Sequence, residues 1–194
     1  MIPSYDHLTA TIDWLDLEVT TVSSTNGFTI HRKTGIHATP IDPDTASGAA
    51  SRFRLRMHDI SSWWDTERRL ERFASLVPLQ PKIAIVGLEL SLDFRIDGGQ
   101  VSDLAELAAH LFKFSGDLSS ENRRLLGEQR GLTRGVHNGN TLAQDFLTLR
   151  PIYVGNVSDG RTQRFYVKTV DQAGKTQLAP ERWSARVENT YTRR

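Results

Sequence analysis

The sequence predicts an α+β protein built on a mainly antiparallel sheet, with helices packed on one face of the sheet and an open polar face on the other. Two observations carry this prediction. Several segments alternate apolar and polar residues with a period of two, which is typical of strands buried on one side only. Two further segments place apolar residues at helical spacing. Because these helices need an apolar surface to bury against, we expect them to cover the apolar face of the sheet.

The elements follow one another in a clear order along the chain. Ser62, with Asp65 three residues later, resembles the N-cap of the first helix. Residues 39–50 are rich in Pro, Asp and Gly and are expected to form a loop, and we assign no structure to residues 115–147. The predicted elements are strands at about residues 11–22 and 51–58, a helix at about 62–77, a central strand at 83–96, a helix at about 101–114, a hairpin of strands at 148–155 and 161–170, and a last strand at 182–188.

Length and composition limit the class of protein. A chain of 194 residues is long enough for one sizeable core, so we expect a single domain over residues 1–194. It contains no cysteine, which excludes disulfides, zinc ribbons and thiol nucleophiles. The amino end has no basic patch leading into an apolar run, and no stretch approaches the roughly 18 apolar residues of a membrane span. We therefore expect a cytoplasmic protein that does not enter a membrane.

Basic side chains are concentrated toward the carboxyl end. Residues 1–120 carry 11 basic and 16 acidic residues, whereas residues 121–194 carry 13 and 7. Nineteen of the 24 basic residues are arginine, whose planar guanidinium can grip two phosphate oxygens at once. A GC-rich genome would also produce this richness in arginine, so the positions of the arginines matter more than their number.

The alternation brings ionisable side chains from five strands to the polar side. If the face is functional, its arginines are suited to bind DNA phosphates. The same pattern is also expected of a solvated sheet with cross-strand ion pairs, each worth a few tenths of a kcal/mol. The residues assigned to this side are Asp16 and Glu18, then Arg52, Arg54 and Arg56, then Glu89, Ser91 and Asp93, then Arg164, Tyr166 and Lys168, and finally Arg186 and Glu188.

The carboxylates of this face could hold a metal ion. Glu89 and Asp93 are four residues apart on one strand, about 13 Å at ~3.3 Å per residue, so one ion would bind only one of them directly. The other ligand would then come from a neighbouring strand, as Glu188 or Asp16 could. Because such a site has only oxygen donors, it predicts Mg²⁺ or Mn²⁺.

Tyr166 is a candidate nucleophile on the predicted polar side. Phe165 and Val167 occupy the core side of its strand, which leaves Tyr166 between two cations, Arg164 and Lys168. We expect these cations to lower the pKa of the phenol below its usual ~10 and to hold a phosphate nearby. A tyrosine in a strand is also a common packing residue.

Three short blocks, taken in order, match the pattern of a known family. They are Gly87-Leu88-Glu89-Leu90-Ser91-Leu92-Asp93-Phe94, Arg164-Phe165-Tyr166-Val167-Lys168 and Arg186-Val187-Glu188. Together they resemble the replication initiation proteins of rolling-circle plasmids and filamentous phages, in the branch that lacks a His-hydrophobic-His motif. In that family a tyrosine attacks the DNA backbone with the help of a divalent metal.

The resemblance implies a role for each matched residue. Tyr166 would be the nucleophile, and Lys168, Arg164 and Arg186 would clamp the phosphate. Glu89, Asp93 and Glu188 would be the acids linked to Mg²⁺ or Mn²⁺. The implied function is an endonuclease that nicks and rejoins one strand of an origin, single-stranded at the nick, and that forms a homodimer. Family members usually continue beyond the last block, so this chain would either be naturally short or lack a C-terminal extension.

Two other functions remain open at this point. The chain could be a catalytically inactive DNA-binding module of the same fold, which would use the basic face and the arginines of residues 123–134. It could also be a structural α+β domain whose polar face is simply ion-paired.

Overall fold

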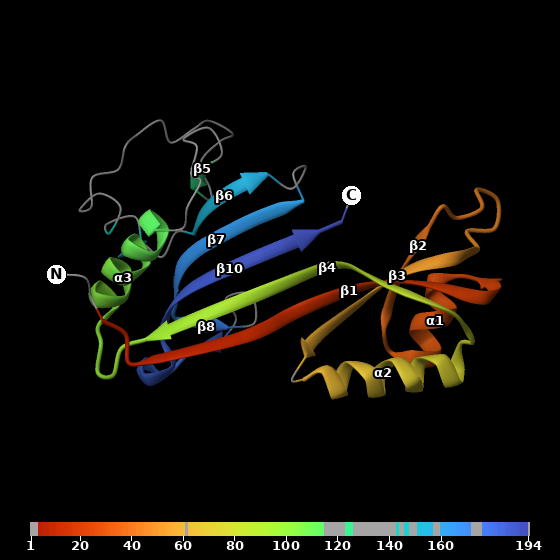
Figure 1. Cartoon of the computed structure of the whole chain (residues 1–194), viewed down its shortest axis with the longest axis horizontal. Helices are drawn as coiled ribbons and strands as arrows, with labels where there is room; N and C mark the ends of the chain where they lie inside the picture. Colours follow the sequence, from red (N-terminus) through yellow and green to blue (C-terminus); the bar gives the residue numbers. More distant parts are fainter. Residues whose placement is uncertain are drawn as a thin grey trace. The chain divides into compact units, whose positions relative to one another are not determined.

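The computed structural model describes residues 4–60, 62–114, 123–125, 143, 146–147, 151–156, 160–171 and 176–193. The protein is α+β, with a large antiparallel sheet and helices packed against it, as predicted (Figure 1). The elements are β1 (His7–Thr25), α1 (Gly27–Thr34), β2 (His37–Ile41), β3 (Ala50–Ile60), α2 (Trp63–Leu76), β4 (Leu79–Arg95), α3 (Val101–Phe114), β5 (Arg123–Leu125), β6 (Ile152–Asn156), β7 (Arg161–Lys168), β8 (Val170–Asp171), β9 (Thr176–Gln177), a 3₁₀ turn (Pro180–Arg182) and β10 (Ser184–Thr192).

The chain divides into two units, which are described separately. The first unit consists of Met1–Ala10 and Ser91–Thr190, and the second of Thr11–Leu90 and Tyr191–Arg194. Because β1 and β4 each contain residues of both units, the chain passes from one unit to the other within these strands.

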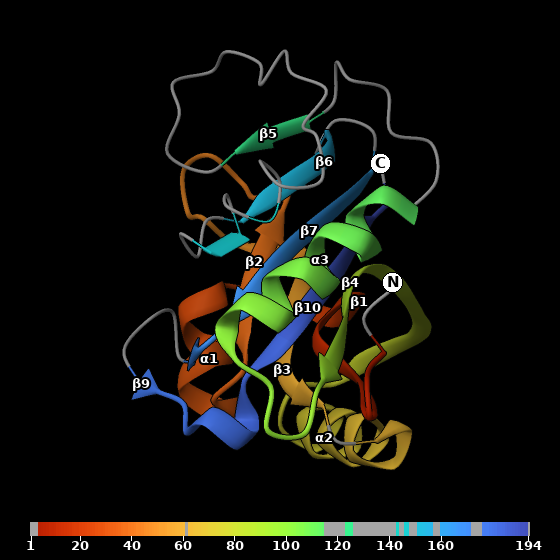
Figure 2. The same ribbon diagram turned by 90° about the vertical axis from the view of Figure 1, so that its left-hand side faces the viewer.

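The first unit packs α3 against its part of the sheet. Its strands follow the order β1-β4-β10-β7-β6-β5, and Figure 2 shows α3 lying across β7 and β10. Phe112 of α3 meets Phe165 of β7 edge to face, with ring centroids 5.4 Å apart, and both rings are buried in one apolar core. The predicted hairpin is confirmed, because β6 and β7 pair antiparallel with Ile152 opposite Phe165.

In the second unit the strands follow the order β2-β3-β1-β4, and two helices pack on one side of them. The period of two in β3 places Phe53, Leu55 and Met57 in a buried core. Ile30 of α1 and Phe73 of α2 pack into the same core. The predicted N-cap of α2 is also confirmed, since Ser62 Oγ accepts a hydrogen bond of 3.2 Å from the backbone N–H of Asp65.

Several elements differ from the prediction. Helix α1 was not predicted, and strand β2 extends into the first residues of the predicted loop at 39–50. Strand β10 begins only at Ser184, because the 3₁₀ turn precedes it, and it continues to Thr192. Most of residues 115–147, with the arginines at 130 and 134, lies outside the described residues, as do residues 148–150 and 157–159 of the predicted hairpin.

Among the described residues, no helix is both long enough and apolar enough to cross a membrane.

Candidate functional site

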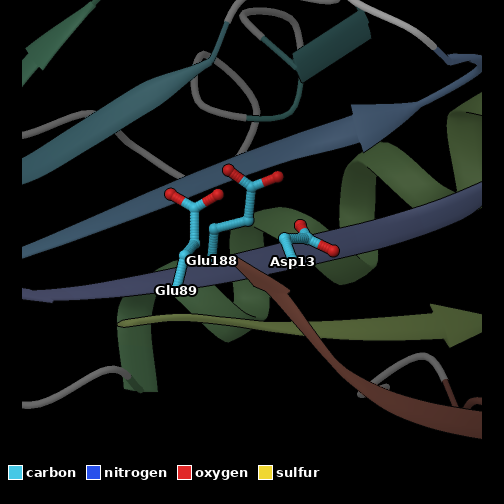
Figure 3. Close-up of side chains that lie close together, drawn as sticks. All are labelled: Asp13, Glu89 and Glu188. Atoms are coloured by element: carbon cyan, nitrogen blue, oxygen red, sulfur yellow. The ribbon is translucent and has the colours of Figure 1, made fainter. Parts of the chain in front are cut away.

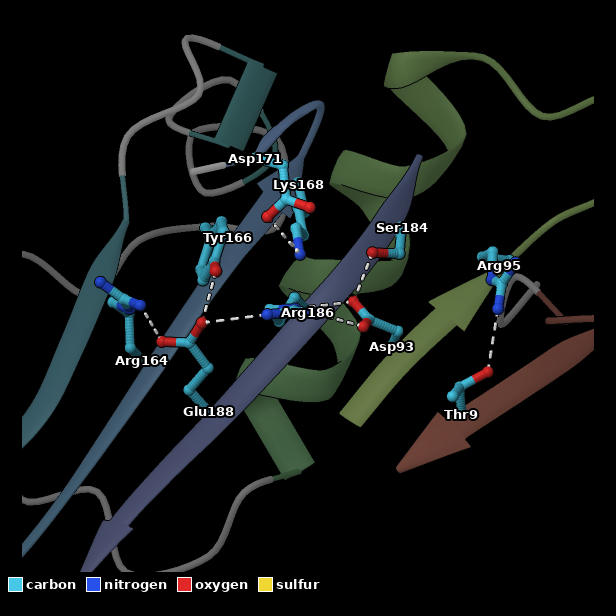
Figure 4. A network of polar contacts seen from close by, with 10 residues as sticks. All are labelled: Thr9, Asp93, Arg95, Arg164, Tyr166, Lys168, Asp171, Ser184, Arg186 and Glu188. Carbon is cyan, nitrogen blue, oxygen red and sulfur yellow. Dashed lines mark hydrogen bonds and ion pairs between the residues drawn. The ribbon is translucent and has the colours of Figure 1, made fainter. Parts of the chain in front are cut away.

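Strands β7 and β10 of the first unit are neighbours that present polar side chains on the side away from the apolar core. Phe165 and Val167 of β7, with Ala185 and Val187 of β10, are buried in that core. Successive residues of a strand point to opposite faces, so the residues between them lie together on the other side. These polar residues, drawn in Figure 4, are Arg164, Tyr166 and Lys168 of β7 and Ser184, Arg186 and Glu188 of β10.

Glu188 is the centre of this group. The Tyr166 hydroxyl donates a hydrogen bond of 2.5 Å to Glu188 Oε1. Arg164 forms an ion pair with the other carboxylate oxygen, and Arg186 Nη1 lies 3.5 Å from Oε1. The Glu188 side chain is only 3% exposed. A buried carboxylate thus touches one phenol and two guanidinium groups (Figure 4).

Arg186 joins Glu188 to a second carboxylate, that of Asp93 on β4. Its Nε donates to Asp93 Oδ1 at 2.8 Å and its Nη2 pairs with Oδ2. The Ser184 hydroxyl donates to Asp93 Oδ1 at 2.6 Å. Burial by itself would raise the pKa of Asp93, but the hydrogen bonds and charge of Arg186, helped by Ser184, outweigh burial and hold that pKa below its usual value.

The environment of Tyr166 overturns one expectation. Burial raises the pKa of the Tyr166 phenol far above its usual value, and the charge and hydrogen bond of Glu188 raise it further. Arg186 and Arg164 oppose this shift without reversing it. The prediction that neighbouring cations lower this pKa is therefore wrong, because the phenol is buried and its hydroxyl meets a carboxylate first. The proton of the phenol accordingly lies in a hydrogen bond to Glu188.

Arg164 and Lys168 flank Tyr166 on β7, as the alternation predicts. The Arg164 guanidinium lies 5.0 Å from the centre of the Tyr166 ring and 6.0 Å from that of Tyr153 on β6. Burial by itself would lower the pKa of Arg164, but the Glu188 charge, together with the hydrogen bond of Tyr153 and the charges of the two tyrosines, outweighs burial and raises that pKa. Lys168 Nζ lies 3.2 Å from Asp171 Oδ1, and the Lys168 side chain is 15% exposed. Both side chains are therefore paired with a carboxylate and partly withdrawn from water.

Some of the predicted metal ligands are already engaged in ion pairs with arginine. Asp93 and Glu188 belong to the first unit, whereas Glu89 belongs to the second. Both acids of the first unit form ion pairs with arginine. Asp93, held by Arg186 and Ser184 together, does not fit a resident metal.

Glu89 has a carboxylate neighbour within its own unit. One oxygen of Glu89 on β4 and one of Asp13 on β1 lie within 4.8 Å of each other. Figure 3 draws these two side chains together with Glu188 of the first unit. Paired carboxylate oxygens are the donors that Mg²⁺ and Mn²⁺ prefer. The chemistry of this pair therefore fits the predicted type of ion.

The three arginines of β3 lie in the second unit and differ in their pairing. Arg56 donates from Nε and Nη2 to the buried carboxylate of Asp16, at 2.8 and 2.7 Å. Arg52 Nη2 donates to Glu18 at 2.7 Å. Arg54 is exposed, and no ion pair to it is found in the described part of the chain. Two of the three predicted DNA contacts thus match the cross-strand ion pairs that the alternation also allowed.

Sequence reasoning assigned no role in these networks to three of their residues. Asp13 occupies an odd-numbered position on β1, as the apolar residues of that strand do. A charged residue in this apolar series is a signal that could have identified it. Ser184 lies on the polar side two residues before Arg186, and alternation alone could have identified it. Trp14 stacks under the Arg56 guanidinium, which lies 4.2 Å from the ring centre. This contact depends on a strand pairing that the sequence does not show.

The chain matches no protein-family model and no curated protein.

The lowered pKa of Asp93 predicts a change in acid stability. A carboxyl group with a folded pKa below its unfolded value of ~3.9 contributes stability that is present above that value and is lost as pH falls through the folded pKa. We expect the free energy of unfolding of Asp93→Asn to be lower than that of the wild type at pH 7. It should also fall less between pH 5 and pH 2. Urea denaturation across this range measures both effects.

Glu106→Gln provides the matched control, because Glu106 is exposed on α3 of the same unit. If the fall in the free energy of unfolding between pH 5 and pH 2 were reduced equally in both variants, the special environment assigned to Asp93 would be contradicted.

Proposed function

We propose that this chain is a replication initiation endonuclease that nicks one strand of DNA at an origin through Tyr166. Its partner would be origin DNA, single-stranded at the cleaved phosphate, in the cytoplasm. Association of two copies into a homodimer belongs to the same proposal. The three sequence blocks that resemble rolling-circle initiators motivate it.

One observation gives the main structural support, namely the 2.5 Å hydrogen bond from the Tyr166 hydroxyl to Glu188. A phenol with a raised pKa is a weak nucleophile unless a base removes its proton as it attacks. Glu188 is in position to accept that proton, and Arg164 and Arg186 beside it would stabilise negative charge on the phosphate. The pair corresponds to a nucleophile and its general base.

The proposed reaction is a transesterification. Tyr166 Oη attacks the phosphorus, its proton passes to Glu188, and the bond from phosphorus to the 3′-oxygen of the preceding nucleotide breaks. The leaving 3′-oxygen takes a proton from water, which leaves a free 3′-hydroxyl and a 5′-phosphate esterified to Tyr166. Lys168, with Arg164, would hold the non-bridging oxygens during the attack. Because the ester stores the energy of the broken bond, the reverse reaction can rejoin the strand.

A divalent cation is part of the proposal but not of any step above. Within the second unit, Asp13 and Glu89 would be the carboxylates that hold Mg²⁺ or Mn²⁺, and such an ion can polarise a phosphate oxygen.

A catalytically inactive DNA-binding module is the second candidate. It is favoured by the ion pairing around Glu188 and by the raised pKa of Tyr166, since both features also belong to a stable polar network without turnover.

Detection of the covalent intermediate separates the two candidates. A random-sequence single-stranded DNA library, labelled at its 3′ end, is incubated with the chain and Mn²⁺ and then run on a denaturing gel. Nicking predicts label that travels with the protein, attached to the tryptic peptide of residues 165–168, which contains Tyr166. A library labelled at its 5′ end should leave no label on the protein. Absence of an adduct, or an adduct on another tyrosine, would refute the proposed nucleophile.

A further inference from the structure

We propose that the uncovered face of the sheet in the second unit binds single-stranded DNA. In this arrangement Arg54 and Lys82 hold phosphates, and the Arg56–Trp14 stack holds one unpaired base. The choice of DNA as the ligand rests on the proposed function, whereas the surface belongs to the second unit alone.

The face is uncovered because both helices of the unit pack on its other side. Ile30 of α1 and Phe73 of α2 are buried among the inward residues of β1 and β3. In the described part of the second unit, no helix packs on the opposite side. That side carries polar and planar groups, which are His37 and Thr39 of β2, Arg52, Arg54, Arg56 and His58 of β3, and Trp14, Asp16 and Glu18 of β1.

This face carries acids as well as bases, including Glu89 of β4, whose charge acts on Arg56, but two of its cations have no acidic partner in the described residues. Asp16 is neutralised by Arg56, and Glu18 by Arg52. Arg54 and Lys82 are exposed, and within the described residues neither of them is ion-paired. Lys82 and Arg52 also line a hollow of about 260 Å³ together with Glu18, Thr20 and Ala84. Cations without an acidic partner beside such a hollow complement the phosphates of a nucleic acid strand.

The Arg56–Trp14 stack makes the face selective for an unpaired strand. Trp14 rests against the bare backbone of Gly87, where an added Cβ would lie 3.1 Å from the ring. Arg56 lies over this ring, and its two hydrogen bonds to Asp16 fix the plane of the guanidinium. A fixed planar cation can stack on the face of a base only where that base is free of neighbouring bases, as in a single strand.

The test measures the binding of the full chain to a fluorescein-labelled 16-nucleotide oligothymidine by anisotropy, at several salt concentrations. EDTA is included, and a gel confirms that the oligonucleotide stays intact. Arg54→Ala should weaken binding about fivefold and reduce the slope of log affinity against log salt by about 0.7, the value for one phosphate contact on a single strand. Trp14→Leu should weaken binding about 5- to 100-fold and leave that slope unchanged.

Arg72→Ala is the matched control, because Arg72 is exposed on α2, the helix that packs on the other side of the sheet. It should change neither the affinity nor the slope. Circular dichroism melting shows whether Trp14→Leu is folded. The inference is overturned if Arg54→Ala binds like Arg72→Ala, or if the duplex of the same length binds as tightly as the single strand.

The adduct assay keeps this result separate from the proposed function. An adduct with normal binding by both variants of the face would refute this inference alone. Weakened binding by those variants without any adduct would support this inference and refute nicking.

Discussion

Replacing Tyr166 with phenylalanine is expected to abolish the covalent DNA adduct and to reduce strand nicking by more than about 10⁴-fold. Phenylalanine has no oxygen to attack phosphorus, so the loss should appear in the chemical step rather than in DNA binding. It also removes the hydrogen bond to Glu188, whose buried carboxylate still keeps the ion pair with Arg164. The nicking rate is measured with the DNA species that yields the adduct in the wild type, and binding is measured by anisotropy in parallel.

Tyr153→Phe is the matched control for this variant. Tyr153 lies on the neighbouring strand β6, and Arg164 contacts its ring as it contacts that of Tyr166. We expect Tyr153→Phe to nick DNA at close to the wild-type rate. Continued nicking by Tyr166→Phe would show that another group attacks the phosphate, and equal losses in the two variants would point to a general disturbance of β6 and β7.

Replacing Arg186 with methionine is expected to lower the free energy of unfolding by about 3–5 kcal/mol. Arg186 is 9% exposed and lies between the carboxylates of Asp93 and Glu188. Methionine fills part of the same volume but leaves two acids withdrawn from water without the cation between them. The cost comes from this uncompensated charge more than from the ion pairs themselves. Urea denaturation at pH 7 measures the change.

A second substitution tests this explanation. If uncompensated charge is the cause, Asp93→Asn should restore part of the stability lost in Arg186→Met, although it destabilises the wild type. Arg182→Met serves as control, since Arg182 is exposed on the 3₁₀ turn just before β10, and a loss within about 0.5 kcal/mol is expected there. Similar losses in Arg186→Met and Arg182→Met would contradict the bridging role.

The sequence predicted well those elements whose periodicity reports burial directly. Phe53, Leu55 and Met57 alternate with arginines, and that pattern is sufficient to orient β3. Helix α1 was not predicted, because its eight residues bury only Ile30 and so show no apolar stripe. Its end signals were nevertheless present, with Asn26 as the N-cap and Gly35 in the left-handed conformation, at φ 75°, as the C-cap.

The sequence predicted which residues form the candidate site better than it predicted their chemistry. Alternation correctly placed Tyr166 on the polar side with Arg164 and Lys168, because direction along one strand is a local property. The sign of the pKa shift was wrong, because it depends on which strand lies next to β7 and on how deeply the phenol is buried. Neither the neighbouring strand nor the depth of burial can be read from one strand's sequence.

The order of the two units along the chain has a consequence for folding during synthesis. Residues 11–90 supply most of the second unit as one continuous stretch, whereas the first unit needs residues before and after that stretch. The backbone N–H of Asp6, for example, donates to the carbonyl of Arg95. At ribosomal speeds of ~5–20 residues per second, residue 190 emerges roughly 5–20 s after residue 90. During that interval the second unit can begin to form its core, while the amino-terminal residues of the first unit must wait for their partners.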